Sequence, residues 1–295
     1  MQTPISVVFP GQGSQALGMF DLTDDQTVRL VNQASSVLGY DLKSLVENGP
    51  KETLDETVFT QPAVFVAGMA KWQHLQQTLP EQPLFLAGHS LGEYTALVAA
   101  GVMDFETGLT LVKKRAQLMQ DAGEALPGAM AAVIGLDNEA VVALCQQVSP
   151  EGAVVAANFN SPAQVVVSGK ADAVDALVLA ARPAGARLAK HIPVSVASHC
   201  FLMQTAAKGL EKALNDVVLE APKISVINNV DVKSETDPDR IKDALVRQLC
   251  QPVRWVDTVR LMANQGVKTM IECGPGRVLT GLAKRTITDI ELQSS

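Results

Sequence analysis

The first part of the chain alternates short apolar runs with longer amphipathic stretches. The apolar runs predict strands over 5–9 (ISVVF) and 84–87 (LFLA), and the amphipathic stretches predict helices over 61–79, 91–100 and from Asp104 to about Gly123. We expect Pro62 in the first turn of its helix, where a missing N–H costs least. Because strands and helices alternate, the pattern predicts a parallel sheet with its functional site at the carboxyl ends of the strands.

From residue 127 to residue 196 the expected order changes to strand, helix, strand, strand, helix, strand. These elements are strands over 129–136, 153–159, 163–169 and 186–194, and helices over 138–148 and 171–181. This order is typical of a ferredoxin-like unit. We therefore expect a small ferredoxin-like domain, 127–196, inserted into a large α/β domain formed by 1–126 and 197–295. The large domain then continues with a helix over 201–216, a strand over 224–228, two helices, a strand over 267–273 and a final helix.

Charge and cysteine content narrow the functional classes. The formal net charge of -7 over 295 residues argues against nucleic acid as the main partner. The cysteines lie far apart without a C-x-x-C pair, which favours reduced thiols over a disulfide framework or a metal site. No signal peptide and no apolar stretch of membrane-spanning length is visible. We expect a cytoplasmic protein that binds neither nucleic acid nor membrane and holds no metal.

The motif GHSLG is the first candidate for chemistry. It places Ser90 between Gly88 and Gly92, after the expected strand 84–87 and before the expected helix 91–100. A G-x-S-x-G sequence between strand and helix is typical of a nucleophile elbow, where a sharp turn exposes the serine hydroxyl above a sheet. The alternative is a tight turn in which small residues simply fit.

A serine nucleophile needs a base within hydrogen-bond reach. His89 lies inside the turn, His74 on a polar helix face and His191 in an expected strand of the small domain. His199, at a loop-to-helix junction of the large domain, is left as the candidate base, although any single histidine can also be a packed or surface imidazole. No Asp or Glu between Ser90 and His199 is placed to complete a triad, so a pair oriented by a backbone carbonyl stays open.

A glycine-containing loop, FPGQGSQ, follows the first strand. It fails the dinucleotide fingerprint G-x-G-x-x-G because Ala16 occupies the position of the last glycine. Backbone N–H groups in such a loop can approach a ligand closely, as an oxyanion hole requires. The alternative is a tight turn without a role.

Arg115 falls on the apolar side of its predicted helix. A helical wheel of 107–122 places it among leucine, valine, methionine and alanine side chains, opposite two lysines and two glutamines. Because a buried guanidinium needs a partner, the position predicts either an internal salt bridge or a fixed cation for a substrate carboxylate.

The motifs FPGQGSQ, GHSLGEY, NFNSPAQVVVSG, ASH and ECGPGRVLTGL occur in this order, with Arg115 between the second and the third. In these motifs, over essentially its whole length, the chain resembles bacterial malonyl-CoA:acyl-carrier-protein transacylases. The family has an α/β-hydrolase-like large domain with a ferredoxin-like insertion. The resemblance implies the following roles: Ser90 as the acylated serine, His199 as the base, the backbone N–H groups of Gln12 and Leu91 as the oxyanion hole, Arg115 as the partner of the malonyl carboxylate, the main-chain carbonyl of Gln248 as the group that orients the histidine, and Asn158 near the mouth of the site.

The resemblance also implies a reaction and its partners. A malonyl group would pass from malonyl-CoA to the phosphopantetheine thiol of acyl carrier protein, in type II fatty acid synthesis. Coenzyme A would enter as a thioester substrate, with no permanently bound cofactor, and we expect a monomer. The acidic carrier would dock on a local basic patch, either Arg187 with Lys190 or Arg277 with Lys284 and Arg285.

Other functions are compatible with parts of this pattern. A serine hydrolase, such as a thioesterase or esterase, would share Ser90 and His199 but would have no use for an inward arginine. A binding protein without turnover would not need both Ser90 and His199. A transferase for acetyl or methylmalonyl groups differs only in the shape of its pocket.

Overall fold

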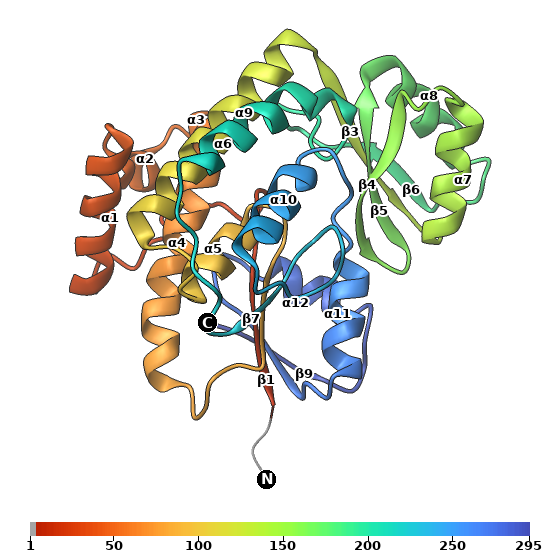
Figure 1. Cartoon of the computed structure of the whole chain (residues 1–295). Helices are drawn as coiled ribbons and strands as arrows, with labels where there is room; N and C mark the ends of the chain where they lie inside the picture. The colour runs from red at the N-terminus through yellow and green to blue at the C-terminus, as the bar shows by residue number, and fades with distance from the viewer. Residues whose placement is uncertain (1–3) are drawn as a thin grey trace.

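A parallel sheet of five strands forms the centre of the larger part of the molecule. The computed structural model of the chain describes residues 4–295 (Figure 1). The strands are β1 (Ile5–Phe9), β2 (Phe85–Gly88), β7 (Ser225–Ile227), β8 (Thr269–Glu272) and β9 (Glu291–Ser294). Their order is β7-β2-β1-β8-β9, with every neighbouring pair parallel. The carboxyl ends of β1 and β2 therefore lie side by side, as the alternating sequence pattern predicts.

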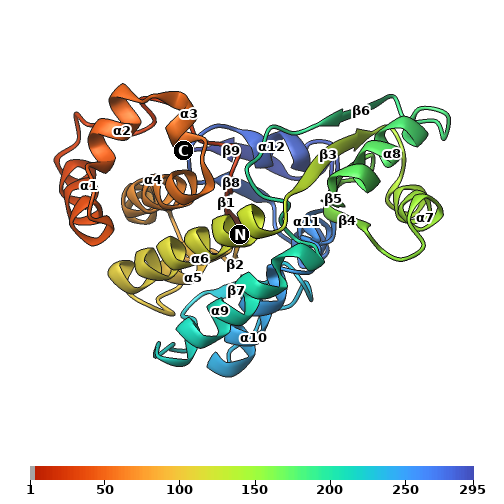
Figure 2. The ribbon, with the colours of Figure 1, turned by 90° about the horizontal axis from the view of Figure 1, so that it is seen from above.

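Helices cover both faces of this sheet because alternate strand residues point to opposite sides. On one face, Val7 and Phe9 join a core with α4 (Thr57–Thr78), α5 (Gly92–Ala99) and α6 (Phe105–Ala125). On the other face, Val8 packs in a second core with α11 (Trp255–Asn264) and α12 (Val278–Ala283). Figure 2 shows the strands nearly end-on between these two groups of helices.

Further helices form an outer layer around α4 and α6. They are α1 (Asp25–Leu38), α2 (Leu42–Asn48), α3 (Lys51–Leu54), the short 3₁₀ helix η1 (Phe201–Met203), α9 (Gln204–Asn215) and α10 (Pro238–Gln248). The first helix packs on α4 and α6, α9 packs on α6, and α10 packs on α9. None of the helices within residues 4–295 combines the length and the apolar character needed to cross a bilayer.

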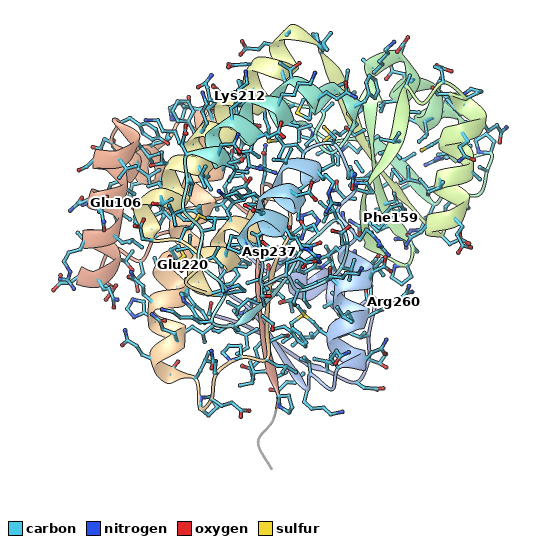
Figure 3. All side chains as sticks on the ribbon, in the orientation of Figure 1. Glu106, Phe159, Lys212, Glu220, Asp237 and Arg260 are labelled. Carbon is cyan, nitrogen blue, oxygen red and sulfur yellow. The ribbon has the colours of Figure 1, made fainter. Side chains whose placement is uncertain are left out.

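A separate antiparallel sheet carries its own core. Its elements are β3 (Gly128–Ile134), α7 (Asn138–Val148), β4 (Val154–Ser161), β5 (Gln164–Lys170), α8 (Ala171–Ala181) and β6 (Leu188–His191), with strand order β4-β5-β3-β6. Apolar side chains of α7 and α8 pack against this sheet. The backbones of Phe159 and Val253 join it to the segment before α11 by an N–H···O bond of 2.9 Å, near the Phe159 label in Figure 3.

Most predicted elements occur where the sequence placed them, with three differences. The helix expected from residue 61 begins at Thr57, because buried packing of Thr57 and Thr60 outweighs the weak helix propensity of β-branched residues. Pro62 therefore lies inside α4 rather than in its first turn. The strand expected over 186–194 is limited to β6, and Pro193, which lacks an N–H, lies beyond its end. The expectation that the final helix ends the fold is wrong, since β9 follows it and pairs with β8.

Candidate active site

Ser90 lies in a sharp turn between β2 and α5. Its φ angle is 52°, in the left-handed region that non-glycine residues rarely adopt. The flanking glycines are required by close backbone contact: a Cβ on Gly92 would lie 2.1 Å from the carbonyl oxygen of Phe9, and one on Gly88 would lie 1.8 Å from the carbonyl carbon of Gly92. The expected strand–turn–helix context of the G-x-S-x-G motif is confirmed.

The close contact at Gly92 gives a stability prediction. We expect Gly92→Ala to lower the free energy of unfolding by about 3 kcal/mol, since the added methyl group displaces the loop after β1. The matched control is Gly281→Ala in α12, where a Cβ would meet open space. This control should be neutral or stabilise the protein by up to about 1 kcal/mol. Urea unfolding followed by circular dichroism measures both, and equal effects would contradict the packing argument.

The hydroxyl of Ser90 is hydrogen-bonded to His199. Ser90 Oγ lies 2.8 Å from His199 Nε2, and His199 Nδ1 lies 2.7 Å from the main-chain oxygen of Gln248. A carbonyl oxygen can only accept a hydrogen bond, so Nδ1 carries the proton and Nε2 is the acceptor for the serine hydroxyl. Within residues 4–295 no carboxylate bonds this imidazole. The arrangement left open by the sequence, a pair oriented by a backbone carbonyl, is the one that the structure contains.

Burial determines the charge state of His199. The imidazole is buried, and burial, together with the nearby positive charge of Arg115, lowers the pKa of His199 to about 3. It is therefore neutral at neutral pH and can accept the serine proton. The remaining histidines have other partners: His74 is hydrogen-bonded to Asp24, His191 pairs with Asp175, and His89, which precedes Ser90 and lines the same cavity, is hydrogen-bonded to Asn160.

Arg115 lies on α6 with its guanidinium directed at Ser90. The side chain is 1% exposed. Its Nη1 donates to Gln61 Oε1 (2.6 Å), and its Nη2 donates to Ser90 Oγ (3.1 Å) and to Gln248 Oε1 (3.0 Å). In the described part of the chain it forms no ion pair, so the internal salt bridge considered from the sequence is not found. A buried cation with only neutral partners faces the serine.

A cavity of about 260 Å³ lies beside Ser90. The candidate residues Gln12, Ser90, Leu91, Arg115, Asn158 and His199 all line it, whereas Gln248 lies behind them and contacts Ser90, Arg115 and His199. The backbone N–H groups of Gln12 and Leu91 donate to no acceptor within residues 4–295. Two free donors beside a serine can stabilise a tetrahedral oxyanion.

The structure adds side chains that sequence reasoning missed. Asn229, in the turn after β7, accepts the N–H of Ser90 at Oδ1 (2.7 Å) and donates from Nδ2 to the carbonyl of Gly88 (2.7 Å). Gln61 and Glu93 are buried polar side chains within α4 and α5. The only signal for them in the sequence was a polar residue within an otherwise apolar helix, and this does not identify a partner.

No metal centre is evident among the residues that the structure describes. No group of three or more His, Cys, Asp or Glu side chains in 4–295 is close enough together to hold a metal ion. The cysteines Cys145, Cys200, Cys250 and Cys273 are free thiols.

Nearly the whole chain is similar to known acyl transferases. The acyl transferase domain family matches residues 7–294. A malonyl CoA-acyl carrier protein transacylase of Haemophilus influenzae is 48% identical over 290 residues, which are 97% of this chain and 93% of that protein. The solved structure of the Coxiella burnetii malonyl CoA-acyl carrier protein transacylase has a TM-score of 0.96 at 44% identity and covers 100% of this chain and 94% of its own. A malonyl-transacylase solved in complex with a type II PKS acyl-carrier protein has a TM-score of 0.95 at 46% identity, with 99% and 96% of the two chains covered.

Proposed function

This chain belongs to the acyl transferase domain family, and we propose that it transfers a malonyl group from malonyl-CoA to the thiol of acyl carrier protein in fatty acid synthesis. The observation that carries the proposal is the buried guanidinium of Arg115, whose hydrogen-bond partners within residues 4–295 are all neutral and whose Nη2 lies 3.1 Å from Ser90 Oγ. A malonyl group attached to Ser90 would bring its free carboxylate into this region. An arginine binds a carboxylate through two parallel hydrogen bonds.

The acylation step follows from the geometry of the dyad. His199 Nε2 takes the Ser90 proton as Oγ attacks the thioester carbon of malonyl-CoA. The N–H groups of Gln12 and Leu91 bind the oxyanion of the tetrahedral intermediate. The carbonyl of Gln248 holds the imidazole in the required tautomer and accepts a hydrogen bond from the imidazolium. The intermediate collapses, and the coenzyme A thiolate takes the proton from His199 and leaves.

The second half of the reaction reverses these steps. The carrier's phosphopantetheine thiol gives its proton to His199 and attacks the malonyl-serine ester, and Ser90 recovers the proton when the thioester has formed. The scheme is ping-pong because coenzyme A leaves before the carrier reacts. We assign Asn158, which lines the cavity, to contact with the substrate. No step needs a bound cofactor, and coenzyme A takes part as the thioester of the substrate.

The hydrolase alternative has less support. It would use the same Ser90, His199 and oxyanion donors, but it gives no reason for a buried guanidinium beside the nucleophile that has no ion-pair partner among residues 4–295. Burying such a charge is costly unless a ligand pairs with it.

We further propose an α/β-hydrolase-like large domain, 1–126 and 197–295, with a ferredoxin-like insertion, 127–196. The parallel sheet with a serine turn after β2 supports the first part, and the antiparallel order β4-β5-β3-β6 with two helices supports the second. The cytoplasmic location, the monomeric state and the absence of nucleic acid or membrane as partners stay predictions.

Initial-rate kinetics test the reaction scheme. With malonyl-CoA and carrier protein as varied substrates, a ping-pong transferase gives parallel double-reciprocal lines. Coenzyme A release should depend on the carrier concentration. Release that is independent of the carrier would identify water as the acceptor and refute the proposed function.

We propose that the carrier docks on Arg277, Lys284 and Arg285, which are exposed at the two ends of α12, a helix that lines the cavity. We expect Lys284→Glu to raise the KM for carrier about fivefold at low salt, with a weaker salt dependence than wild type, because an attractive charge is lost. The control is Lys212→Glu on α9, labelled at the top of Figure 3. Equal effects of the two variants would exclude this patch.

A further inference from the structure

Glu93 is a buried carboxyl group directly behind the serine turn. It is the second residue of α5, three positions after Ser90, and is 2% exposed. A single oxygen, Oε2, accepts two hydrogen bonds, from Gln248 Nε2 (2.8 Å) and from the N–H of Asn229 (2.9 Å). None of the proposed steps uses this group, although its partners contact both Ser90 and Arg115.

The Gln248 amide lies between Glu93 and Arg115. Its Nε2 donates to Glu93 and to the carbonyl of Ser90 (3.1 Å), while its Oε1 accepts from Arg115 Nη2 (3.0 Å). A guanidinium only donates, whereas an ionised carboxylate only accepts. The reversed amide would therefore direct N–H groups at the guanidinium and an oxygen at the carboxylate. Glu93, together with the carbonyl of Ser90, thus favours the orientation in which the amide oxygen faces Arg115.

We propose that Glu93 is a positioning residue for acyl selectivity, which acts by holding the Gln248 side-chain oxygen against Arg115 so that the guanidinium stays directed at the acyl group on Ser90. The inference rests on the proposed role of Arg115 toward the malonyl carboxylate. An ion pair of Glu93 with Arg115 would occupy the donors that the substrate needs. The intervening amide fixes the guanidinium and leaves donors for a ligand.

The contact survives protonation of Glu93. Burial raises the pKa of Glu93 to about 7, against the opposing effect of its hydrogen bonds from Gln248 and Asn229. Both donors use Oε2, so a proton on the other oxygen leaves both bonds in place. Glu93→Gln reproduces this neutral form, since its amide oxygen can accept the same two bonds.

Glu93 also supports the turn itself, and the experiment has to separate the two effects. Its second donor, Asn229, is hydrogen-bonded to the N–H of Ser90 and to the carbonyl of Gly88. Loosening these bonds would slow malonyl and acetyl transfer alike, whereas misplacing Arg115 would slow malonyl transfer only. The ratio of kcat/KM for malonyl-CoA to that for acetyl-CoA therefore reports a misplaced Arg115 and not a loosened turn.

The test compares this ratio in wild type, Glu93→Leu and Glu93→Gln. We expect Glu93→Leu to lower the ratio at least about tenfold, because Arg115 loses a fixed hydrogen-bond partner, and Glu93→Gln to keep it within about threefold. Val46→Ala, a core substitution in α2 far from the site, should reduce stability without moving the ratio. An equal loss for both acyl groups in Glu93→Leu would overturn the proposal.

A second variant tests the proposal if Glu93→Leu does not fold. Gln248→Met removes the side-chain amide but keeps the main-chain carbonyl that bonds His199. It should lower the ratio to a similar extent, and adding Glu93→Leu to it should lower the ratio no further, since both act through one contact. If the losses of selectivity from the two substitutions add, Glu93 does not act through Gln248 and the proposal is refuted. If wild type itself shows no malonyl preference, the proposed function fails instead, independently of Glu93.

Discussion

Replacing Arg115 by alanine is expected to lower kcat/KM for malonyl-CoA by about 10³- to 10⁴-fold and to leave acetyl transfer nearly unchanged. A site built to pair with a polar group rejects an analogue without that group by factors of about 10⁴ to 10⁵. In wild type an acetyl group leaves the buried guanidinium without an anion, and in the variant neither acyl group has this partner. Selectivity, and not only rate, should therefore collapse.

The measurement is a competition assay with malonyl-CoA and acetyl-CoA on one carrier preparation. Lys114→Ala is the matched control, since Lys114 is the preceding residue of α6 and is exposed. It should change neither rate by more than about twofold. If Arg115→Ala retains the wild-type selectivity, the arginine does not bind the substrate carboxylate.

Replacing His199 by alanine should lower the rate of Ser90 acylation by about 10⁴-fold. The variant lacks the base that is hydrogen-bonded to Ser90, and removing such a group leaves only the rate enhancement from the oxyanion hole and substrate binding. Substrate binding should change little, because Arg115 and the cavity remain.

Single-turnover coenzyme A release at saturating malonyl-CoA measures this loss. The control is His191→Ala, which removes an exposed histidine paired with Asp175 at the end of β6. Wild-type acylation should also show no loss from protonation of His199 near pH 6.5, since the pKa of this imidazole is held at about 3 and the base form persists as the pH falls. A rate in His199→Ala within about tenfold of wild type would exclude it as the base.

Local patterns in the sequence predicted the elements that carry the site. The strand–serine–helix pattern around Ser90 and the apolar face around Arg115 each depend on residues close in sequence, and both occur as expected. The helices expected over 138–148 and 171–181, α7 and α8, have the predicted bounds. Periodicity is informative here because each element buries one defined face.

Contacts between distant segments could not be predicted from residue patterns. The bond from His199 to Gln248 joins a loop to the end of α10, 49 positions away, and the bond from Ser90 to Asn229 spans 139 positions. The resemblance to the family supplied Gln248, whereas nothing in the sequence indicated Asn229, and Glu93 stood out only as a polar residue within an apolar helix. A buried polar side chain is chosen by its partner, and the partner is known only once the chain has folded.

The proposed transfer requires a malonyl ester at Ser90. We would mix the protein with malonyl-CoA in the absence of carrier and measure its intact mass, with Ser90→Ala in parallel. We expect a gain in mass of one malonyl group that is absent from Ser90→Ala and is lost when carrier protein bearing the phosphopantetheine thiol is added. Steady release of coenzyme A without any adduct would contradict it, because water would then be the acceptor and the protein a hydrolase.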